Sequence, residues 1–385
     1  MYKHLLPTFQ LLLPTDTETL FAQACLLAGP ECPKAWAAWC KRVGDPGLHL
    51  KNARSGIKRL GPILAGNLKR NHVELERKFL SYLHTTYFRE ELRHNTYRKI
   101  LGDVLRVLAE NDGKFVLLRA PILSKTMYPR PGIRHCHDID VYLEKAEAER
   151  VIALFNERGW TVYDHMHSTV FVRHKSNMLI CLHSSWFSLP GYEGFVYDAK
   201  EQIELQNYAG VQVHALDRES MLVHILGHAA SNKSRKTLLW VCDAWYLIAN
   251  SPDLDWARVL RSIQHGRLAF PLSVFFHYLK ESLNAAIPAE FIRQLDDRLR
   301  FVTDNDLERA FAGLRIDAGL TRQKLYRNIQ TKAGRLFFLR MLLLPMPSLL
   351  QRHYGVNAWA LPFLYFYRPV RYLFVHLRKR TLSTK

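Results

Sequence analysis

Acidic residues are scarce in this 385-residue sequence, and they are scarcest toward its C-terminus. The chain has 35 Asp and Glu against 54 Lys and Arg, which gives a formal charge of +19. Between Arg315 and Lys385 there are 14 Lys and Arg but a single acid, Asp317, so this segment alone carries +13. Such a balance is typical of proteins with acidic partners, which here means nucleotides, nucleic acid or an anionic membrane surface.

Three further absences limit the class of protein. The six cysteines include no CxxC pair and no tight framework, which argues against a disulfide scaffold and indicates reduced thiols. No apolar run is long enough to span a bilayer, because the most lipid-like stretch, LFFLRMLLLPMPSLL, is broken by Arg340, Pro345 and Pro347. The N-terminal MYKHLLPTFQLLLP lacks the apolar core and cleavage site of a signal peptide. We therefore expect a cytoplasmic protein, either free or peripheral at a membrane.

Large apolar side chains are abundant, and their spacing divides the chain into three regions. Hydrophobic residues make up 48% and aromatic residues 12% of the sequence, as in an ordered protein with a large core. Residues 1–110 and 216–385 have the apolar spacing of helices, whereas residues 111–215 mix strand and helix patterns. The expected fold class is α+β, with a small mixed-sheet core flanked by N-terminal and C-terminal helical regions. The second helical region ends in a basic aromatic tail.

The central region contains patterns for individual elements. The apolar run KFVLLR predicts a buried strand, and DIDVYL alternates acidic and apolar residues like a strand with one polar face. KAEAERVIALFNERG has the apolar stripe of an amphipathic helix. TVFVRH and MLICLH, separated by the polar turn KSN, predict a β-hairpin. Asp217 is the expected N-cap of the next helix, RESMLVHILGHAASN.

Two acids, Asp138 and Asp140, lie two residues apart in the predicted strand DIDVYL. Alternate strand residues point the same way, so both carboxylates would share one face while Ile139 points away from it. Paired carboxylates suit a hard divalent cation, which takes oxygen ligands. The alternative is a solvated edge strand with alternating acids, and the spacing alone does not separate the two.

The two acids belong to a longer motif, YPRPGIRHCHDIDVYL. Its proline-glycine loop, arginine and D-x-D resemble an uncharacterised bacterial nucleotidyltransferase family. The resemblance continues into MLICLHSSWF, which is similar to the family's acid-x-His-Trp strand, and into the helical stretch MLVHILGHAASNKSRKTLLWVCDAWYLI. It covers roughly residues 20 to 290 and implies the nucleotidyltransferase fold shared with DNA polymerase β.

The resemblance also implies a reaction and roles for individual residues. An enzyme of this kind transfers a nucleoside monophosphate from an NTP to an acceptor, which the sequence does not identify. Asp138 and Asp140 would hold Mg²⁺ or Mn²⁺ for that step. Arg134, just before the acids, and Arg119, at the end of KFVLLR, would contact phosphate. For Arg134 the alternative is an exposed loop arginine.

The sequence departs from the family motif at two places. Leu118-Arg119-Ala120 replaces a lysine-glycine at the end of a strand, so Arg119 would supply the charge of the lysine. Cys181 stands where the family has its third acid, and a thiol is a poor ligand for magnesium. His183, on the same strand face, would then act as base or ligand; a buried structural histidine is the alternative. Two hypotheses follow: a Mg²⁺-dependent nucleotidyltransferase, or a catalytically degenerate relative that serves as a binding or adaptor protein.

Two histidines and a cysteine directly precede the acids. His135, Cys136 and His137 are adjacent on an extended chain, where side chains diverge, and no second Cys/His pair has zinc spacing. No zinc is therefore expected. The two histidines are expected to be loop residues beside an anionic ligand, which would favour their protonation.

A second histidine pair lies in the predicted helix after Asp217. His224 and His228 are four residues apart and share a helix face. With Asp243 they would make a metal triad, but no glutamate follows His224 as a zinc-protease motif requires. Packing of the helix on the α/β core, or lining of the nucleotide cleft, is the favoured interpretation.

The C-terminal tail NAWALPFLYFYRPVRYLFVHLRKR interleaves aromatic residues with Arg368, Arg371, Arg378, Lys379 and Arg380. Aromatic and basic residues together suit a membrane interface or stacked nucleic-acid bases. The alternative is a helix that packs its aromatics on the core and leaves its arginines in water. Residues 315–385 are the segment in which a membrane surface or nucleic acid is expected to bind.

Overall fold

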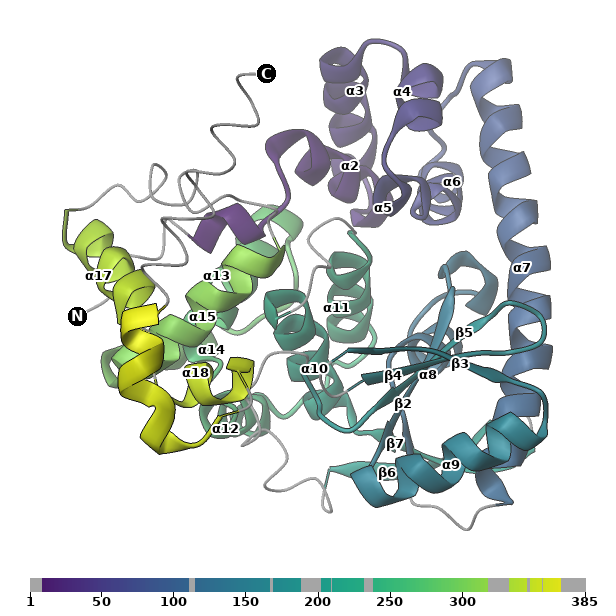
Figure 1. The fold of residues 1–385 in the computed structure, drawn as a ribbon. Helices are drawn as coiled ribbons and strands as arrows, with labels where there is room; N and C mark the ends of the chain where they lie inside the picture. The colour runs from purple at the N-terminus through teal and green to yellow at the C-terminus, as the bar shows by residue number, and fades with distance from the viewer. Residues whose placement is uncertain are drawn as a thin grey trace, which may run out of the picture.

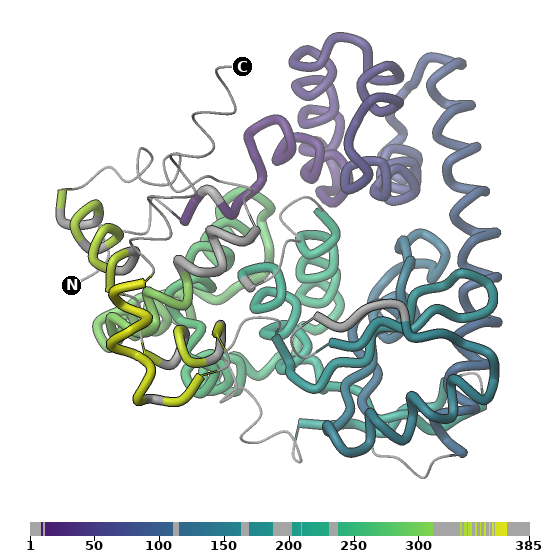
Figure 2. The backbone as a smooth tube through the Cα atoms, viewed as in Figure 1, coloured from purple at the N-terminus to yellow at the C-terminus, as the bar shows by residue number. Residues whose placement is uncertain are grey.

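The structure is a computed structural model of the chain (Figures 1 and 2). It describes residues 9–110, 115–166, 169–187, 202–208, 210–231, 238–317, 332–344, 347–354 and 356–367.

Six α-helices of the described part precede the first strand. They are α2 (Asp16–Leu26), α3 (Glu31–Val43), α4 (Pro46–Asn52), α5 (Ser55–Lys58), α6 (Gly61–Arg70) and α7 (Arg77–Ala109). Thr15 begins α2 with a capping box, in which its hydroxyl accepts from the backbone N–H of Glu18 and the Glu18 carboxylate accepts from that of Thr15. Figure 1 shows α7 reaching from the other N-terminal helices to the side of the sheet.

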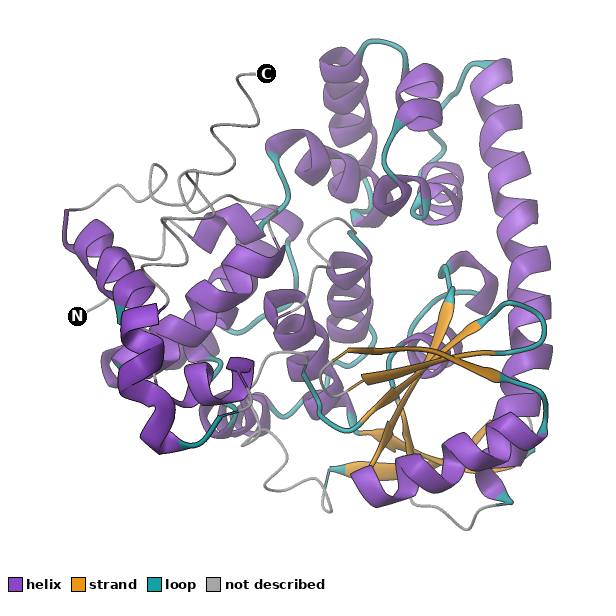
Figure 3. Cartoon of the chain, viewed as in Figure 1, coloured by secondary structure: helices purple, strands orange, loops and turns teal. Residues whose placement is uncertain are grey.

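Within the described residues, seven strands form one mixed sheet (Figure 3). They are β1 (Phe115–Leu117), β2 (Asp138–Leu143), β3 (Thr161–Met166), β4 (Thr169–Arg173), β5 (Leu179–His183), β6 (Ile203–Tyr208) and β7 (Val211–Leu216). Their order across the sheet is β3-β4-β5-β2-β1-β7-β6. β2 is parallel to β5 and β1 is parallel to β7, and the other neighbours are antiparallel. The expected α+β fold, a mixed sheet flanked by helical regions, is confirmed.

Local patterns predict the centre of the sheet better than its edges. DIDVYL is β2, KFVLLR contains β1, and the predicted hairpin is the antiparallel pair β4–β5. The amphipathic helix is α9 (Lys145–Glu157), and a short helix, α8 (Ala120–Thr126), follows β1. β3, β6 and β7 were not predicted. β6 is an edge strand with several exposed residues, so it lacks the apolar run that marks a buried strand.

β2 lies at the centre of the sheet, between β5 and β1. Ile139 and Val141 on one face are fully buried, and Asp140 on the other is only 4% exposed. The interpretation of DIDVYL as a solvated edge strand is therefore wrong. An aspartate on a buried central strand must be neutralised or hydrogen-bonded by its neighbours, because an isolated buried charge is strongly unfavourable.

Eight α-helices of the described part follow the sheet. They are α10 (Arg218–Ser231), α11 (Leu239–Ala249), α12 (Trp256–His265), α13 (Ala269–Leu283), α14 (Ala289–Arg298), α15 (Asp304–Asp317), α17 (Lys332–Leu343) and α18 (Pro347–Tyr354). Asp217 caps α10 as predicted, with its carboxylate accepting from the Ser220 N–H at 2.8 Å. Among the described residues, no helix is both long and apolar enough to cross a membrane.

One apolar core joins the helices before and after the sheet. Phe9 packs edge-to-face against Phe270 of α13, with ring centroids 4.8 Å apart. The side-chain amide of Gln23 in α2 donates to the carbonyl of Ser282 at 2.7 Å. These contacts place the C-terminal helices against the N-terminal ones, so that α10 and α11 are held next to the sheet.

Candidate functional site

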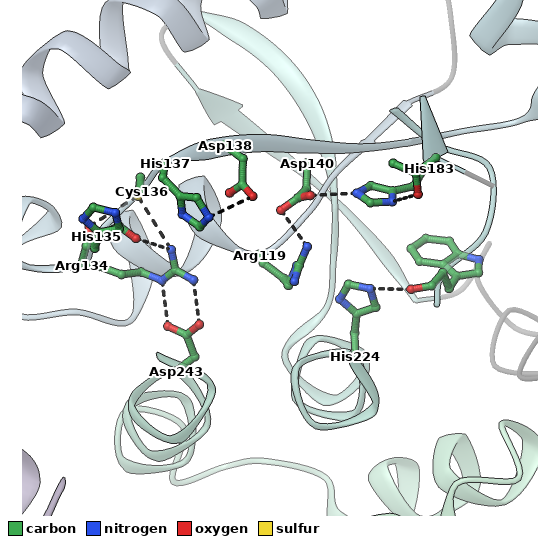
Figure 4. Close-up of polar contacts among 12 residues, drawn as sticks. Arg119, Arg134, His135, Cys136, His137, Asp138, Asp140, His183, His224 and Asp243 are labelled. Atoms are coloured by element: carbon green, nitrogen blue, oxygen red, sulfur yellow. Dashed lines mark hydrogen bonds and ion pairs between the residues drawn. The ribbon is translucent and has the colours of Figure 1, made fainter. Parts of the chain in front are cut away.

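The two acids of β2 project from the same side of the sheet. In Figure 4, Asp138 and Asp140 both point from the strand toward α10 and α11, which carry His224 and Asp243. Their exposure differs, since the side chain of Asp138 is 23% exposed and that of Asp140 only 6%. The outer acid can therefore meet a ligand from solution, whereas the inner acid interacts mainly with other side chains of the protein.

Asp140 is held by a cation and an imidazole. Its Oδ2 lies 2.7 Å from Nη2 of Arg119, and its Oδ1 lies 2.8 Å from Nε2 of His183. Although burial opposes ionisation, Arg119 and His183 together hold the pKa of Asp140 well below its usual value. Asp140 is therefore a carboxylate at any physiological pH.

Arg119 reaches Asp140 from an unusual backbone position. It joins the end of β1 to the start of α8 with φ +44°, in the left-handed region that favours glycine. Non-glycine residues keep such conformations only where the surroundings hold them in place. Among the described residues its Nε is buried without a hydrogen-bond partner. The guanidinium of Arg119, which the sequence predicts to contact phosphate, is thus directed at Asp140. Its Nε–H makes no hydrogen bond among the described residues.

The parallel pairing of β2 and β5 brings Cys181 and His183 to Asp140. The register places Cys181 directly beside Asp140, and His183 follows two residues later on the same side. Thr169 of β4 holds the ring from behind, with its Oγ1 3.0 Å from Nδ1 of His183. Donor atoms of Asp140, Cys181 and His183 all lie within 4.8 Å of one another. His183, for which the sequence allows a structural or a catalytic role, is partly buried and hydrogen-bonded at this cluster.

The Cys181 thiol is 4% exposed, and the metal-free protein keeps it protonated. Burial, and then the charges of Asp140 and Asp138, raise the pKa of Cys181 far above its usual value. Cys181, which the resemblance places at a third acid, is thus neutral in this chain. The site carries less negative charge than three carboxylates would.

Asp138 has a different environment from Asp140. Among the described residues it has no arginine or lysine ion-pair partner, and Nε2 of His137 lies 3.4 Å from its Oδ2. Burial and the neighbouring charge of Asp140 raise the pKa of Asp138 to about 7. Arg59, at the end of α5, is close enough for its charge to interact with Asp138. No local pattern in the sequence predicts this contact of Arg59, because the residue follows a helix that is far from Asp138 in the chain.

A divalent cation fits the Asp138 side of this pair. Carboxylate oxygens are the ligands that hard cations prefer, and Asp138 offers a part-exposed carboxylate. Burial, and then the charge of Asp140, raise its pKa, and a bound cation would favour its ionised form. On the far side of Asp140 the donors are mixed, with sulfur and nitrogen beside oxygen. The two sides of the pair therefore suit different ions.

Arg134 is committed to a partner within the protein. Its Nε and Nη2 donate to the two carboxylate oxygens of Asp243 at 2.8 and 2.7 Å, and Tyr128 donates to Oδ1 of Asp243 at 2.6 Å. Arg134 is only 5% exposed, so its interpretation as an exposed loop arginine is wrong. The geometry also leaves no free edge of the guanidinium for the predicted phosphate contact. The bidentate pair instead fastens the segment before β2 to α11.

The residues between Arg134 and Asp138 turn to separate partners. Nδ1 of His135 lies 2.9 Å from Glu90 of α7, and the Cys136 thiol donates to the carbonyl of Arg134 at 3.4 Å. Partial burial, together with Arg59 and His135, lowers the pKa of His137, so this imidazole is neutral near pH 7. The expectation that an anionic ligand favours protonation of His137 concerns the bound state and stays a prediction.

His224 and His228 make no triad with Asp243, whose carboxylate is occupied by Arg134. Nε2 of His224 is 3.0 Å from the carbonyl of Trp186, and burial lowers the pKa of His224 to about 3. Both histidines nonetheless approach the site, since their charges would interact with Arg119 and Asp140. Two neutral imidazoles thus lie near Arg119 and Asp140, and the lining of a nucleotide cleft by these histidines stays a prediction.

The C-terminal segment exposes large apolar side chains. Leu336 and Leu343 of α17 are 70% and 57% exposed, and Trp359, Phe363 and Phe366 are 71–78% exposed. The prediction that these aromatics pack on the core is wrong for the three named. The basic residues Arg368, Arg371, Arg378, Lys379 and Arg380 lie outside the described residues.

A family model described as "Uncharacterised nucleotidyltransferase" matches residues 55–284 of this chain. The match begins with α5, includes every strand of the sheet and ends just after α13. No curated protein and no solved structure matches the chain.

Proposed function

The chain belongs to the uncharacterised nucleotidyltransferase family, and we propose that it binds an NTP with a divalent cation and transfers its nucleoside monophosphate to an acceptor. The observation that carries this proposal is the pair of acids on the central strand. Asp140 is anchored by Arg119 and His183, while Asp138 stays part-exposed with a raised pKa. This arrangement suits a cation that arrives with its nucleotide.

Each residue of the site has a separate task in the proposed reaction. Asp138 and Asp140 hold Mg²⁺ or Mn²⁺, which when bound offsets charge on the phosphate oxygens. The acceptor oxygen bonds to the α-phosphorus, the bond to the β-phosphate oxygen breaks, and pyrophosphate leaves. His183 is the residue nearest Asp140 that can take the acceptor proton. Arg119 keeps a fixed positive charge beside the phosphates.

Nucleotide binding tests the proposal directly. The purified chain is incubated with each labelled NTP in Mg²⁺ or Mn²⁺, beside an Asp138→Ala/Asp140→Ala variant. We expect at least about a tenfold loss of binding in the variant, because its cation ligands are gone. Asp253→Asn, a change in a surface ion pair with Arg218, is the matched control and should bind as the parent does. If no NTP binds, or if the double variant binds equally well, the proposal fails.

Cation binding is expected to depend on pH through Asp138. A group whose pKa is about 7 is mostly protonated at pH 6 and mostly ionised at pH 8, and a bound proton competes with the cation. Affinity for Mn²⁺ should therefore rise about tenfold between pH 6 and pH 8. Electron paramagnetic resonance of free Mn²⁺ measures this affinity at each pH. An Asp138→Asn variant should bind Mn²⁺ more weakly and with a flat profile; a steep profile in that variant would assign the titration to another group.

A catalytically degenerate binding or adaptor protein is the second candidate function. Two observations favour it: Cys181 replaces the third carboxylate, and Arg119 already neutralises Asp140. Such a protein would bind NTP without releasing pyrophosphate. Measuring bound nucleotide and released pyrophosphate on the same sample separates the two functions. A transferase also releases no pyrophosphate when its acceptor is missing, so the measurement is repeated with a cell extract that supplies an acceptor.

The exposed apolar side chains of residues 336–367 suggest a partner for the C-terminal segment. We propose that this segment, within the basic stretch 315–385, binds an anionic membrane surface and makes the protein peripheral at a cytoplasmic membrane. Phe363→Ser/Phe366→Ser should reduce sedimentation with phosphatidylserine vesicles at low salt. Phe301→Ser, at another exposed phenylalanine, is the control and should not. Retention of vesicle binding by the double variant, or preferential binding to single-stranded nucleic acid, would contradict the proposal.

A further inference from the structure

Three different donor atoms converge on the inner side of the site. Oδ1 of Asp140, the thiol of Cys181 and a ring nitrogen of His183 come from two adjacent parallel strands and lie within 4.8 Å of one another. We propose that Asp140, Cys181 and His183 bind a transition-metal ion of the Zn²⁺ class. This site would be separate from the hard cation that Asp138 helps to hold. It rests on the proposed function in that it shares Asp140 and His183 with the proposed nucleotide site, but it can be loaded and measured without nucleotide.

The chemistry of the donors sets the class of ion. Thiolate and imidazole are preferred by Zn²⁺ and other transition metals, whereas Mg²⁺ prefers oxygen ligands alone. A set of one carboxylate, one thiolate and one imidazole therefore fits Zn²⁺ better than Mg²⁺. Three protein ligands also leave a fourth position open, as in zinc sites that bind a substrate or water. The expectation of no zinc was argued for His135, Cys136 and His137, which are not part of this set.

The residues behind the ligands support the same assignment. Metal-binding histidines commonly donate their second ring N–H to a nearby acceptor, and Thr169 lies 3.0 Å from Nδ1 of His183. With Nδ1 donating to Thr169, a bound ion would take the place of the proton by which Nε2 donates to Oδ1 of Asp140 at 2.8 Å in this structure. Ligating carboxylates are also hydrogen-bonded from outside, and Arg119 binds Oδ2 of Asp140 at 2.7 Å. Oδ1 of Asp140 is thereby directed at the other two donors.

Each of the three side chains is also shielded from water. The side chains of His183 and Asp140 are 14% and 6% exposed, and Cys181 is 4% exposed. A preformed and buried donor set loses little side-chain entropy when the ion binds. Asp138, two residues from Asp140 and more exposed, lies at the edge of this cluster.

Co²⁺ is the probe that reports the proposed ligand set directly. The full-length chain, freed of metal with a chelator, is titrated with Co²⁺ in the absence of nucleotide. A thiolate-to-Co²⁺ charge-transfer band should appear in the near ultraviolet at one equivalent. Zn²⁺ should remove the band stoichiometrically, whereas millimolar Mg²⁺ should leave it unchanged.

Matched variants identify the ligands. Cys181→Ser should abolish the band, whereas Cys136→Ser, at another buried thiol outside the donor set, should keep it. Thr169→Val should weaken Co²⁺ binding about tenfold or more, because it removes the outer contact of His183. Asp138→Asn should keep the band even though the proposed nucleotide site has lost a ligand, so failure of one proposal is distinguishable from failure of the other. Circular dichroism establishes that each variant is folded.

The proposal is overturned by any of three results. One is the absence of a charge-transfer band in the folded parent protein. Another is a band that survives Cys181→Ser, which would place the thiolate ligand elsewhere among the cysteines. The third is displacement of Co²⁺ by Mg²⁺ as readily as by Zn²⁺, which would show a site that prefers hard cations.

Discussion

Replacing Asp243 with asparagine is expected to lower the free energy of unfolding by about 3–5 kcal/mol. The buried guanidinium of Arg134 donates to both oxygens of Asp243, and Tyr128 donates to one of them. Asparagine has nearly the same shape but no charge, so Arg134 would keep a positive charge in the interior without a counter-charge. Urea unfolding followed by circular dichroism measures the loss.

The exposed pair of Arg218 and Asp253 is the matched control for this prediction. It is also bidentate, through Nη1 and Nη2 of Arg218 at 2.7 and 2.8 Å, but its side chains are 37% and 67% exposed. Water screens such a pair and hydrates the arginine when the acid is removed. Asp253→Asn should leave the unfolding midpoint unchanged. Equal effects at Asp243 and Asp253 would show that burial does not determine the strength of these pairs.

Cys181→Asp is expected to make the stability of the protein depend on Mg²⁺. The variant places a third carboxylate beside Asp138 and Asp140. With a chelator present to remove metal ions, we expect its free energy of unfolding to fall by about 2–3 kcal/mol, because the carboxylates repel one another. Millimolar Mg²⁺ should restore that loss, since a cation that binds only the folded state stabilises it. Wild type without nucleotide should respond little to Mg²⁺. Thermal unfolding with and without Mg²⁺ measures both effects.

Two comparisons sharpen the Cys181→Asp experiment. Cys181→Asn has a similar volume without the charge, and it should be insensitive to Mg²⁺. If Cys181→Asp gains nucleotidyl transfer, this would support a site that has lost its activity in the present chain. If the variant instead loses an existing activity, Cys181 belongs to a working site. A Cys181→Asp variant that ignores Mg²⁺ would contradict the placement of this residue beside the two acids.

The sequence was a good guide to local structure near the site. DIDVYL is β2 at the predicted residues, and the hairpin around KSN is β4–β5. These predictions succeed because a strand's alternation of polar and apolar residues is visible in the sequence itself. The same alternation put Cys181 and His183 on one face, and the parallel register of β2 and β5 then placed that face beside Asp140.

The interactions of the arginines could not be predicted in this way. Arg134 and Asp243 are 109 residues apart, and neither has a local signal that names the other. The sequence predicts a phosphate contact for Arg119, and it has no signal for the ion pair that Nη2 of Arg119 makes with Oδ2 of Asp140 at 2.7 Å. Whether a polar side chain meets solvent, a ligand or another side chain depends on which elements pack above it.

The sequence by itself therefore determined that two acids stand on one face of a strand, and that Cys181 and His183 share a face of another strand. Only the tertiary structure decided that Asp140 is buried and paired while Asp138 remains part-exposed. It also decided that Cys181 and His183 join Asp140 as donors. The reason is physical: alternation along one strand fixes the direction of a side chain, whereas its burial, pKa and partners are fixed by neighbouring strands and helices that come from distant parts of the chain.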